Sequence, residues 1–479
     1  MKLSVRRFTN WLASPRLAVL LLLALSVVSF LATLVPQNDM GEAKVAEWAA
    51  FNPIAERVVA VFGFHDAFRS PIFLGLAALL AASTVACSWR RTRVAVGRFR
   101  LLASLDGGEA RKLLERPSFT VAVNQDSSEA ALAATAAVLE SVGLHAERSG
   151  ALVTARSSKW AVTGSPVFHW ALVTIMLVVA AGQLSRSEGL MGVPVGDSAP
   201  EAAGSFGVLD AGPLYRWSAR PLTIRVDDLA PTYVVNGVER GPAPTVTVLD
   251  PSGRTVASQL VYPNRPLRFG SRLIHASDYG LAASFAVDSA EGKELARSSA
   301  LIDFSEAATS STAPGEFGLT DASGVERVRG SVSVPLGTSG GQVVRALPRN
   351  PQAVFALVSA DGNPVGAARL RVGERMPLPD GSSLRLLGIG YYARLSVVDD
   401  WSVSVLYGLF GVALAGLCIA ILMRQVLVVA GVRPTDVGSE IVVRCVDWRG
   451  GRSVAEETER RLRGVSREDA NRGGESRDD

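Results

Sequence analysis

The stretch Leu17–Val35, LAVLLLLALSVVSFLATLV, contains no charged residue. About 19 helical residues at 1.5 Å rise per residue cross a hydrocarbon core of roughly 30 Å, so this stretch predicts a membrane-spanning helix. A cleaved signal peptide is the alternative, because Arg6 and Arg7 precede the run and resemble a twin-arginine signal. However, Phe30–Leu34 offers no clear small-residue cleavage site, so we expect the span to be retained.

Three further runs are apolar and free of Asp, Glu, Lys and Arg. They are Pro71–Trp89, Trp160–Ser185 and Trp401–Met423. Buried helices of soluble proteins are rarely so long and so free of charge. The fold class predicted is a multi-pass α-helical membrane protein with four transmembrane helices, a large extracytoplasmic β-rich domain and a small cytoplasmic α+β insert.

The arginines predict how the spans are oriented. They precede span one, follow span two and follow span four, at positions 6, 7, 16, 90, 91, 93, 98, 100 and 424. Because Lys and Arg concentrate on the cytoplasmic side, both termini are expected there, in a plasma membrane protein. Alternation of the spans then places residues 186–400 outside the cytoplasm.

The predicted order of parts follows from these spans. It runs as N-terminus and span one (1–36), outer loop (37–70), span two (71–89), cytoplasmic α+β insert (90–159), span three (160–185), extracytoplasmic β domain (186–400), span four (401–423) and cytoplasmic tail (424–479). Ser305–Gly315 is expected to be a mobile loop, and Ser453–Asp479, which is charged and poor in apolar residues, is expected to be disordered.

Short alternating runs predict the two soluble parts. In the insert, Ser118–Val123 and Ala151–Ala155 are expected strands, with an alanine-rich helix over Ser127–Val142 between them. The outer segment carries many β-type runs separated by turn signals, which predicts an antiparallel sandwich or open barrel. The runs are Leu222–Val226, Thr245–Leu249, Val256–Tyr262, Ala283–Val287, Ala353–Val358 and Ala393–Val398.

Composition excludes several functions. The net charge is only +4, and the arginines gather beside apolar runs instead of forming a basic stripe, so no nucleic acid partner is expected. The cysteines, Cys87, Cys418 and Cys445, form no CxxC or CxxCH spacing, so the chain is not itself a c-type cytochrome. No nucleophile elbow, phosphate loop or catalytic carboxylate pair is found, and Asp399–Asp400 is interpreted as the polar boundary before span four.

Several motifs together resemble the ResB (CcsB) family of cytochrome c biogenesis proteins. The first span ends Leu34-Val35-Pro36-Gln37, and Gly63-Phe64-His65-Asp66-Ala67-Phe68-Arg69-Ser70 leads into the second span, which closes on Cys87-Ser88. Span three begins near Gly164 and carries His169. Arg272–Gly280 resembles the family's outer β-strand motif, with His275 where glutamine is commoner. The resemblance covers nearly the whole chain.

This resemblance implies a role with a CcsA (ResC) type membrane partner. The pair would export or deliver haem and support its attachment to apocytochrome c, with a thioredoxin-like reductant acting on the outer face. The chain itself would be a non-catalytic or co-catalytic subunit of a cytochrome c synthase complex. It departs from the family at Arg69, where a histidine is often found, and at Pro71-Ile72, which replaces an aromatic pair, so no haem ligand is carried over there.

The four histidines limit any imidazole ligation of iron. His169 is the leading candidate haem and metal ligand, because an imidazole inside an apolar span needs a partner. A packing hydrogen bond between helices is the alternative. His65 is placed at the outer interface, where it either contacts haem or anchors the loop. His145 and His275 are expected to be structural.

Arg69 is a candidate partner for a haem propionate, because a guanidinium holds carboxylates in two bonds. A snorkelling arginine at a helix end is the alternative. Cys87 and Cys418 are interpreted as small hydrophobic residues at or in the spans. The competing function is a membrane receptor or assembly scaffold whose outer β domain binds a ligand, although the tail shows no recognisable signalling element.

Overall fold

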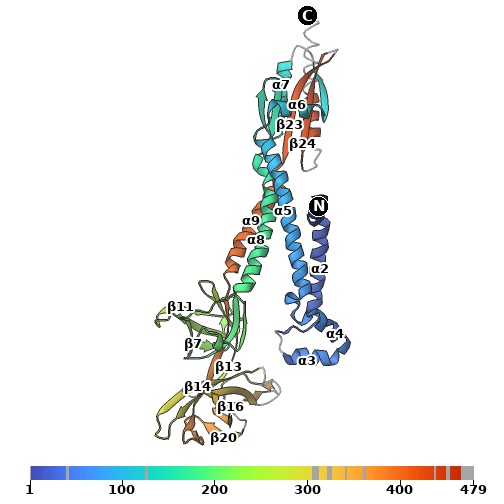
Figure 1. Ribbon diagram of the computed structural model, residues 1–479. Coiled ribbons are helices and arrows are strands. Elements are labelled where there is room, and N and C mark those ends of the chain that lie inside the picture. Colours follow the sequence, from blue (N-terminus) through green and yellow to red (C-terminus); the bar gives the residue numbers. More distant parts are fainter. Residues whose placement is uncertain are drawn as a thin grey trace. The chain divides into compact units, whose positions relative to one another are not determined.

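The computed structural model describes residues 2–38, 42–123, 128–304, 312–320, 326–339, 342–359, 363–435, 438–448 and 454–464. The chain forms two units (Figure 1). The helical unit comprises residues 1–178 and 404–479, and the β unit comprises residues 179–403.

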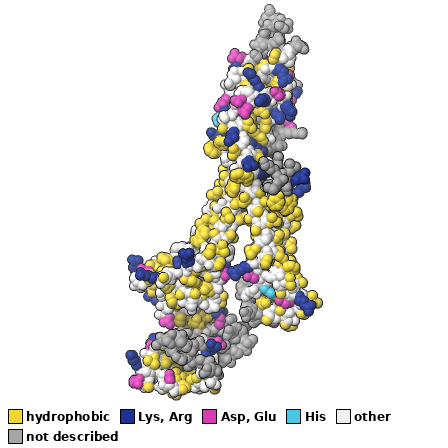
Figure 2. All heavy atoms as spheres, in the orientation of Figure 1, with side chains coloured by type: hydrophobic (Ala, Val, Ile, Leu, Met, Phe, Trp, Pro, Cys, Tyr) yellow, Lys and Arg dark blue, Asp and Glu magenta, His cyan; other side chains and the backbone are white. Residues whose placement is uncertain are grey.

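Four helices are long and apolar enough to cross a membrane, within the part of the chain that the structure describes. They are α2 (Pro15–Thr33), α5 (Pro71–Ala103), α8 (Gly164–Ser185), preceded by the 3-10 turn η4 (Lys159–Val162), and α9 (Ser402–Leu422). Hydrophobic side chains cover the outside of these helices (Figure 2). The expectation of four long apolar helices is therefore confirmed.

Helix α5 does not end where the apolar run ends at Trp89. It continues to Ala103, because Leu102 is buried together with Val162 and Leu427 in the core of the soluble α+β domain. The arginine-rich part of α5 is thus a rigid extension of span two that enters this domain.

Helices α8 and α9 approach closely at glycines. A Cβ added at Gly416 would lie 2.7 Å from the backbone nitrogen of Phe168, and one added at Gly164 would lie 2.4 Å from that of Ala420. Small residues let membrane helices pack backbone to backbone, which strengthens their van der Waals contact. The glycine near the start of span three is therefore required by its neighbour in span four.

We predict that Gly416→Ala destabilises the protein by about 1–3 kcal/mol, because the added methyl group forces the two backbones apart. Gly411→Ala is the matched control: it lies on the same helix, and a Cβ there meets nothing within 4 Å. Thermal unfolding of the detergent-solubilised chain measures both. Equal unfolding temperatures for the two variants would contradict the close crossing.

The first two spans are joined by a small helical segment. It contains α3 (Glu42–Phe51), α4 (Pro53–Phe62) and the 3-10 helix η2 (Phe64–Arg69). Gly63 ends α4 in the left-handed conformation (φ 67°), which turns the chain into η2. Before the first span, helix α1 (Lys2–Leu12) contacts α5. The hydroxyl of Ser83 in α5 donates to the carbonyl oxygen of Leu12 at 2.7 Å.

The soluble part of the helical unit is an antiparallel sheet with the order β1-β24-β23-β3-β2. Its strands are β1 (Phe119–Val123), β2 (His145–Ser149), β3 (Leu152–Arg156), β23 (Val426–Thr435) and β24 (Gly438–Asp447), and its helices include α6 (Gly107–Leu114) and α7 (Ser128–Ser141). The predicted helix and strands of the insert are confirmed. The tail after span four supplies the two strands β23 and β24, which we did not predict, so insert and tail form one domain.

The prediction of disorder over Ser453–Asp479 is wrong at its start. Residues 454–464 form a helix, in which Val454 and Leu462 are buried against the face of the sheet that Leu132 and Leu139 also cover. Two apolar side chains eight residues apart lie on the same face of a helix, which is enough to dock it. Residues 465–479 lie outside the described residues.

The β unit contains three larger sheets. One has the order β11-β10-β7-β5, a second β15-β16-β19-β20, and a third β12-β13-β22-β4-β6 with β14 and β21 at its side. The strands are β4 (Ser187–Pro194), β5 (Ser198–Pro200), β6 (Val208–Ala211), β7 (Thr223–Ala230), β10 (Ala243–Leu249), β11 (Thr255–Leu260), β12 (Leu267–Phe269), β13 (Arg272–Asp288), β14 (Glu294–Ile302), β15 (Thr312–Thr320), β16 (Glu326–Pro335), β19 (Gln352–Ser359), β20 (Pro364–Arg371), β21 (Arg375–Pro377) and β22 (Ser383–Asp399). The predicted β-rich domain and its six strands are confirmed.

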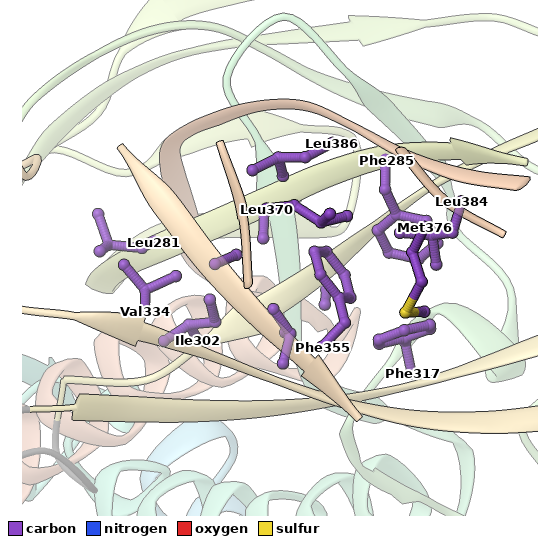
Figure 3. Close-up of a cluster of buried hydrophobic side chains, with 14 of the residues drawn as sticks. Leu281, Phe285, Ile302, Phe317, Val334, Phe355, Leu370, Met376, Leu384 and Leu386 are labelled. Carbon is purple, nitrogen blue, oxygen red and sulfur yellow. The ribbon is translucent and has the colours of Figure 1, made fainter. Parts of the chain in front are cut away.

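Two 17-residue strands, β13 and β22, run through two separate hydrophobic cores. Ile274 of β13 belongs to the first core, with Val226 and Val246, whereas Phe285 belongs to the second, with Phe355 (Figure 3). The register of β13 shifts between Ala276 and Asp278, which adds one residue. Because side chains alternate with period two, this bulge changes which residues face inward and lets one strand serve both cores.

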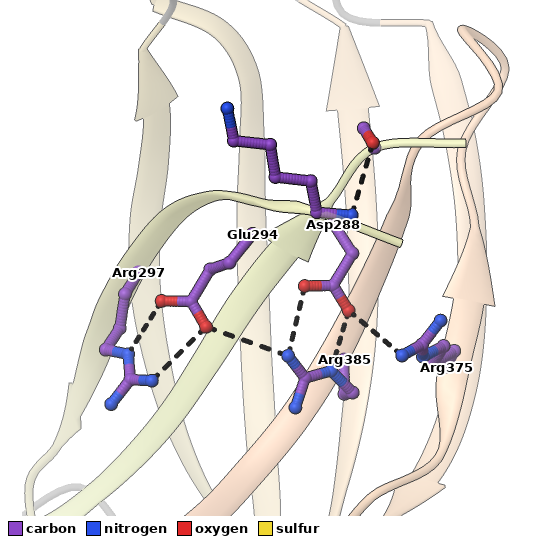
Figure 4. A network of polar contacts seen from close by, with 7 residues as sticks. Asp288, Glu294, Arg297, Arg375 and Arg385 are labelled. Atoms are coloured by element: carbon purple, nitrogen blue, oxygen red, sulfur yellow. Dashed lines mark hydrogen bonds and ion pairs between the residues drawn. The ribbon is translucent and has the colours of Figure 1, made fainter. Parts of the chain in front are cut away.

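A buried carboxylate is held at the end of β13. Asp288 is fully buried and accepts two hydrogen bonds from Arg385, with Arg375 at 3.5 Å (Figure 4). The Arg385 guanidinium lowers the pKa of this carboxyl below its ordinary value, despite the opposing effect of burial. A charge this deeply buried requires such pairing, so the network fixes the edge where β13, β14, β21 and β22 meet.

The prediction of a mobile loop over Ser305–Gly315 is wrong at its end. Residues 305–311 lie outside the described residues, whereas Thr312–Gly315 belong to β15 and pair with β16. Ser, Thr and Ala do not by themselves exclude a strand, because pairing with a neighbouring strand decides it.

Candidate functional site

His169 lies five residues into α8, close to the soluble α+β domain of the helical unit. Its Nδ1 donates to the carbonyl oxygen of Ser165, one turn earlier, at 2.8 Å. A carbonyl can only accept, so the proton of the neutral ring is on Nδ1 and Nε2 carries a lone pair. Among the described residues none donates to Nε2. The ring is thus held in a tautomer in which Nε2 could bind a metal ion.

The residues around His169 attach α8 to α5. Arg91 of α5 donates to the hydroxyl of Ser165 at 3.0 Å, and the indole of Trp170 donates to Thr92 at 2.9 Å. The ring of Phe168 meets the imidazole edge-to-face, with centroids 5.2 Å apart. Polar bonds on both sides of His169 therefore fix its helix against span two at the level of Arg91.

His65 lies in η2, at the opposite end of α5, and both of its ring nitrogens are bonded. Nδ1 lies 2.8 Å from the carbonyl oxygen of Pro36, and Nε2 lies 2.8 Å from a carboxylate oxygen of Glu56. The carbonyl and the ionised carboxylate both accept, so the ring donates to both when it is protonated. Trp48 of α3 packs edge-to-face on it. In this arrangement His65 offers no lone pair to iron, and it joins α4 to the end of span one.

Gln37, which ends the Leu34-Val35-Pro36-Gln37 motif, also joins the end of span one to η2. The side-chain amide of Gln37 donates to the carbonyl oxygens of Ala32 and Phe64 at 3.0 Å each, and its oxygen accepts from the backbone N–H of Ala67 at 3.2 Å. One side chain therefore connects the end of α2 with η2. The Pro36-Gln37 pair holds this junction together, which sequence patterns alone did not reveal.

Burial lowers the pKa of His65, but the bonds to Pro36 and Glu56 outweigh it and raise the pKa above 6.5. A raised folded pKa means that the stabilisation is complete below 6.5 and is lost as the pH rises through the folded value. We predict faster hydrogen exchange in α4 and η2 above that value than below it, after correction for intrinsic exchange. Glu56→Gln should weaken this pH dependence, because the charged partner is gone.

Arg69 is exposed at the end of η2, and its guanidinium lies 3.9 Å from a carboxylate oxygen of Asp66. Arg69 and His65 thus lie in the same short segment η2, but His169 does not join them. The stretch of α5 between Pro71 and Arg91 is about 30 Å long, so the two groups lie near opposite ends of the span. The haem-contact assignments of His169, His65 and Arg69 stay predictions.

The remaining histidines and cysteines lie in regular structure. His275 is in β13 opposite Ser396, and His145 is in β2 opposite Arg156. Burial raises the pKa of the Cys445 thiol to about 11, which keeps it unreactive. Across the described ranges of the chain, no group of three or more His, Cys, Asp or Glu side chains is arranged to hold a metal ion.

The sequence did not predict a cluster of ion pairs in the β unit, where the start of β13 meets the end of β22. Arg272 donates to both carboxylate oxygens of buried Glu201 (2.8 and 2.7 Å) and lies 3.4 Å from Asp399. Asp399 also accepts from Tyr215 at 3.1 Å and from Ser271. Asp399 was interpreted only as a boundary residue, but it links β22 to the start of β13. The separation of these residues along the chain gives no local signal of their meeting.

Known proteins resemble this chain over nearly its whole length. The model of the ResB-like family matches residues 16–459. The cytochrome c biogenesis protein CcsB of a Synechococcus species is 25% identical over 427 residues, covering 86% of this chain and 87% of that protein. CcsB of Trichormus variabilis is 22% identical over 425 residues, covering 86% and 83%. CcsB of Thermosynechococcus vestitus is 26% identical over 291 residues, covering 58% of this chain and 61% of that protein.

Proposed function

Because the chain belongs to the ResB-like family, we propose that it acts in cytochrome c biogenesis, the process for which its CcsB relatives are named. Its substrate in this role is haem. With a CcsA/ResC-type membrane partner, it receives haem, delivers it across the plasma membrane and supports its attachment to apocytochrome c. The chain contributes binding and positioning, and bond formation takes place in the complex.

One observation supports the haem step: His169 presents an unprotonated Nε2 from a membrane helix. A half-buried imidazole whose other nitrogen is fixed by a backbone carbonyl has the orientation and basicity of an iron ligand. It lies beside the α+β domain, which the arginines assign to the cytoplasm. Haem is therefore bound first near the cytoplasmic face, where its synthesis would supply it.

The outer face needs a separate source of electrons. Attachment of haem requires free thiols on the apocytochrome, and residues 186–400 contain no cysteine. The β unit cannot itself exchange disulfides with the apoprotein. A thioredoxin-like reductant therefore belongs to the same pathway, and the β unit acts by shielding haem or presenting the apocytochrome.

The test is the haem content of the detergent-purified chain, with and without the CcsA-type partner, together with holocytochrome c in a strain lacking the chain. We expect a haem spectrum that is strongest for the complex, and loss of holocytochrome c that the intact chain restores. Normal holocytochrome c in the deletion strain would contradict the proposal. It would favour a receptor or scaffold role instead.

The proposed direction of transport requires the β unit to lie outside. We predict that reporter fusions after Gly253 report an extracytoplasmic position, whereas fusions after Gly450 report a cytoplasmic one, as the arginine distribution requires. A cytoplasmic signal at Gly253 would reverse the topology and with it the side on which His169 meets haem.

A further inference from the structure

An apolar stripe on α4 has no partner within the described part of the chain. Ile54, Val58 and Val61 are 82%, 52% and 79% exposed, and Phe51, just before the helix, is 79% exposed. Their spacing of i, i+4 and i+7 places them on one face of the helix. Single exposed apolar residues are ordinary, but a row of this kind marks a surface that binds something apolar.

The opposite face of α4 is already in contact with the protein. Val59 is buried, and Glu56 accepts from His65. Because α4 has a satisfied inner face, the stripe is a second face that points away from the rest of the helical unit. It is not an unfinished part of the core.

The position of α4 is fixed at the end of the membrane spans. The chain of bonds from Glu56 through His65 to the carbonyl of Pro36 ties α4 to the residue that follows span one. The hydroxyl of Ser70 caps α5 by accepting from the N–H of Phe73, so span two begins directly after η2. Figure 1 shows α3 and α4 lying across the end of α2 and α5.

The neighbouring elements expose apolar side chains as well. Leu34 at the end of α2 is 60% exposed and Phe68 in η2 is 56% exposed. Since η2 contacts both α2 and α4, the apolar surface that α2 turns toward lipid continues through η2 to the stripe. Continuity with a lipid-facing surface favours lipid as the occupant.

The charges beside the stripe also suit a bilayer surface. Lys44, Arg57 and Arg69 are exposed, whereas the acidic Glu56 and Asp66 contact His65 and Arg69. Long basic side chains at the border of an apolar face reach lipid phosphates while their stems lie in the interface. We propose that α4 is an interfacial helix whose stripe inserts into the bilayer surface on the side where spans one and two are joined.

Spin labels on the full chain test this proposal. Cys87, Cys418 and Cys445 are first replaced by alanine, and the chain is reconstituted in vesicles of phosphatidylethanolamine and phosphatidylglycerol. Labels are attached to Ile54→Cys and Val58→Cys, with Val61→Cys as a further site on the stripe. Ala60→Cys is the matched control, because Ala60 is exposed on the same helix but, at about 100° per residue, lies about 120° around the helix from Ile54 and about 160° from Val58.

We expect labels on the stripe to be accessible to oxygen and protected from a water-soluble nickel chelate, at a depth of about 5–10 Å below the phosphates. The control label should show the reverse. Nickel accessibility of the stripe equal to that of Ala60→Cys would overturn the proposal. So would protection of the stripe from both reagents, which would mean that a protein surface, such as a second copy, covers it.

Discussion

His169→Ala is expected to lower the haem recovered with the complex by about tenfold or more, equivalent to about 1.4 kcal/mol of binding free energy. The substitution removes the only imidazole that α8 presents, and with it the Nε2 lone pair proposed as the iron ligand. Holocytochrome c should fall in parallel. The measurement is the haem absorbance of the purified complex, normalised to the amount of this chain in the membrane.

His169→Asn separates ligation from packing. The asparagine amide can donate to the carbonyl of Ser165 as Nδ1 does, but it offers iron no imidazole nitrogen. If His169 only fixes the helix, asparagine should restore function; if it ligates haem, asparagine should behave like alanine. Added imidazole should then restore part of the haem in the alanine variant. Normal haem and cytochrome levels in both variants would exclude a role for His169.

Arg272→Ala is expected to destabilise the β unit by about 3 kcal/mol, near the lower end for breaking a buried ion pair because Arg272 is partly exposed. The substitution removes both charge-assisted hydrogen bonds to the Glu201 carboxylate. This loss is costly because the Glu201 side chain is only 4% exposed, and water cannot replace the bonds. Arg297→Ala is the control, because its bond to Glu294 is exposed, and an exposed ion pair adds little to stability. Chemical unfolding of the full chain in detergent measures both.

Two further experiments test whether the unpaired Glu201 carboxylate causes the loss of stability in Arg272→Ala. Burial raises the pKa of Glu201 above its ordinary value of 4.5, despite the opposing charge of Arg272. Without Arg272 the pKa should rise further, so protonation at mildly acidic pH should relieve part of the loss, and the destabilisation should grow as the pH rises. Adding Glu201→Gln to Arg272→Ala should also recover part of the stability, since the unpaired charge of the buried Glu201 is then removed. A loss equal to that of Arg297→Ala would rule out this explanation.

Local sequence patterns predicted the structure correctly wherever the structure of a segment depends mainly on its own residues. The uncharged runs predicted all four long helices, because about 20 apolar residues have few other stable environments. Alternation predicted β7 and β19, since one face of each strand is buried. The single imidazole in an apolar run identified His169 as the candidate ligand before its geometry was known.

Contacts between distant segments could not be predicted in this way. The sequence placed His65 at an interface, but its two bonds to Pro36 and Glu56 depend on how the end of α2, helix α4 and η2 meet in the fold. Similarly, the charged appearance of residues 454–464 suggested disorder, and only the apolar face of the sheet gives Val454 and Leu462 a place to dock.

The sequence by itself determined the four helices that are long and apolar enough to span a membrane, the β-rich character of residues 186–400 and the family, because these depend on composition and short motifs. Only the tertiary structure decided that β23 and β24, more than 260 residues after the insert, complete its sheet, and that β13 and β22 serve two cores through bulges. Strand pairing joins backbones regardless of their distance in sequence, and a bulge changes the inward face without any change in composition. The pairing of Arg272 with Glu201 and Asp399 was decided in the same way, because a buried charge is stabilised by whichever opposite charge the fold brings to it.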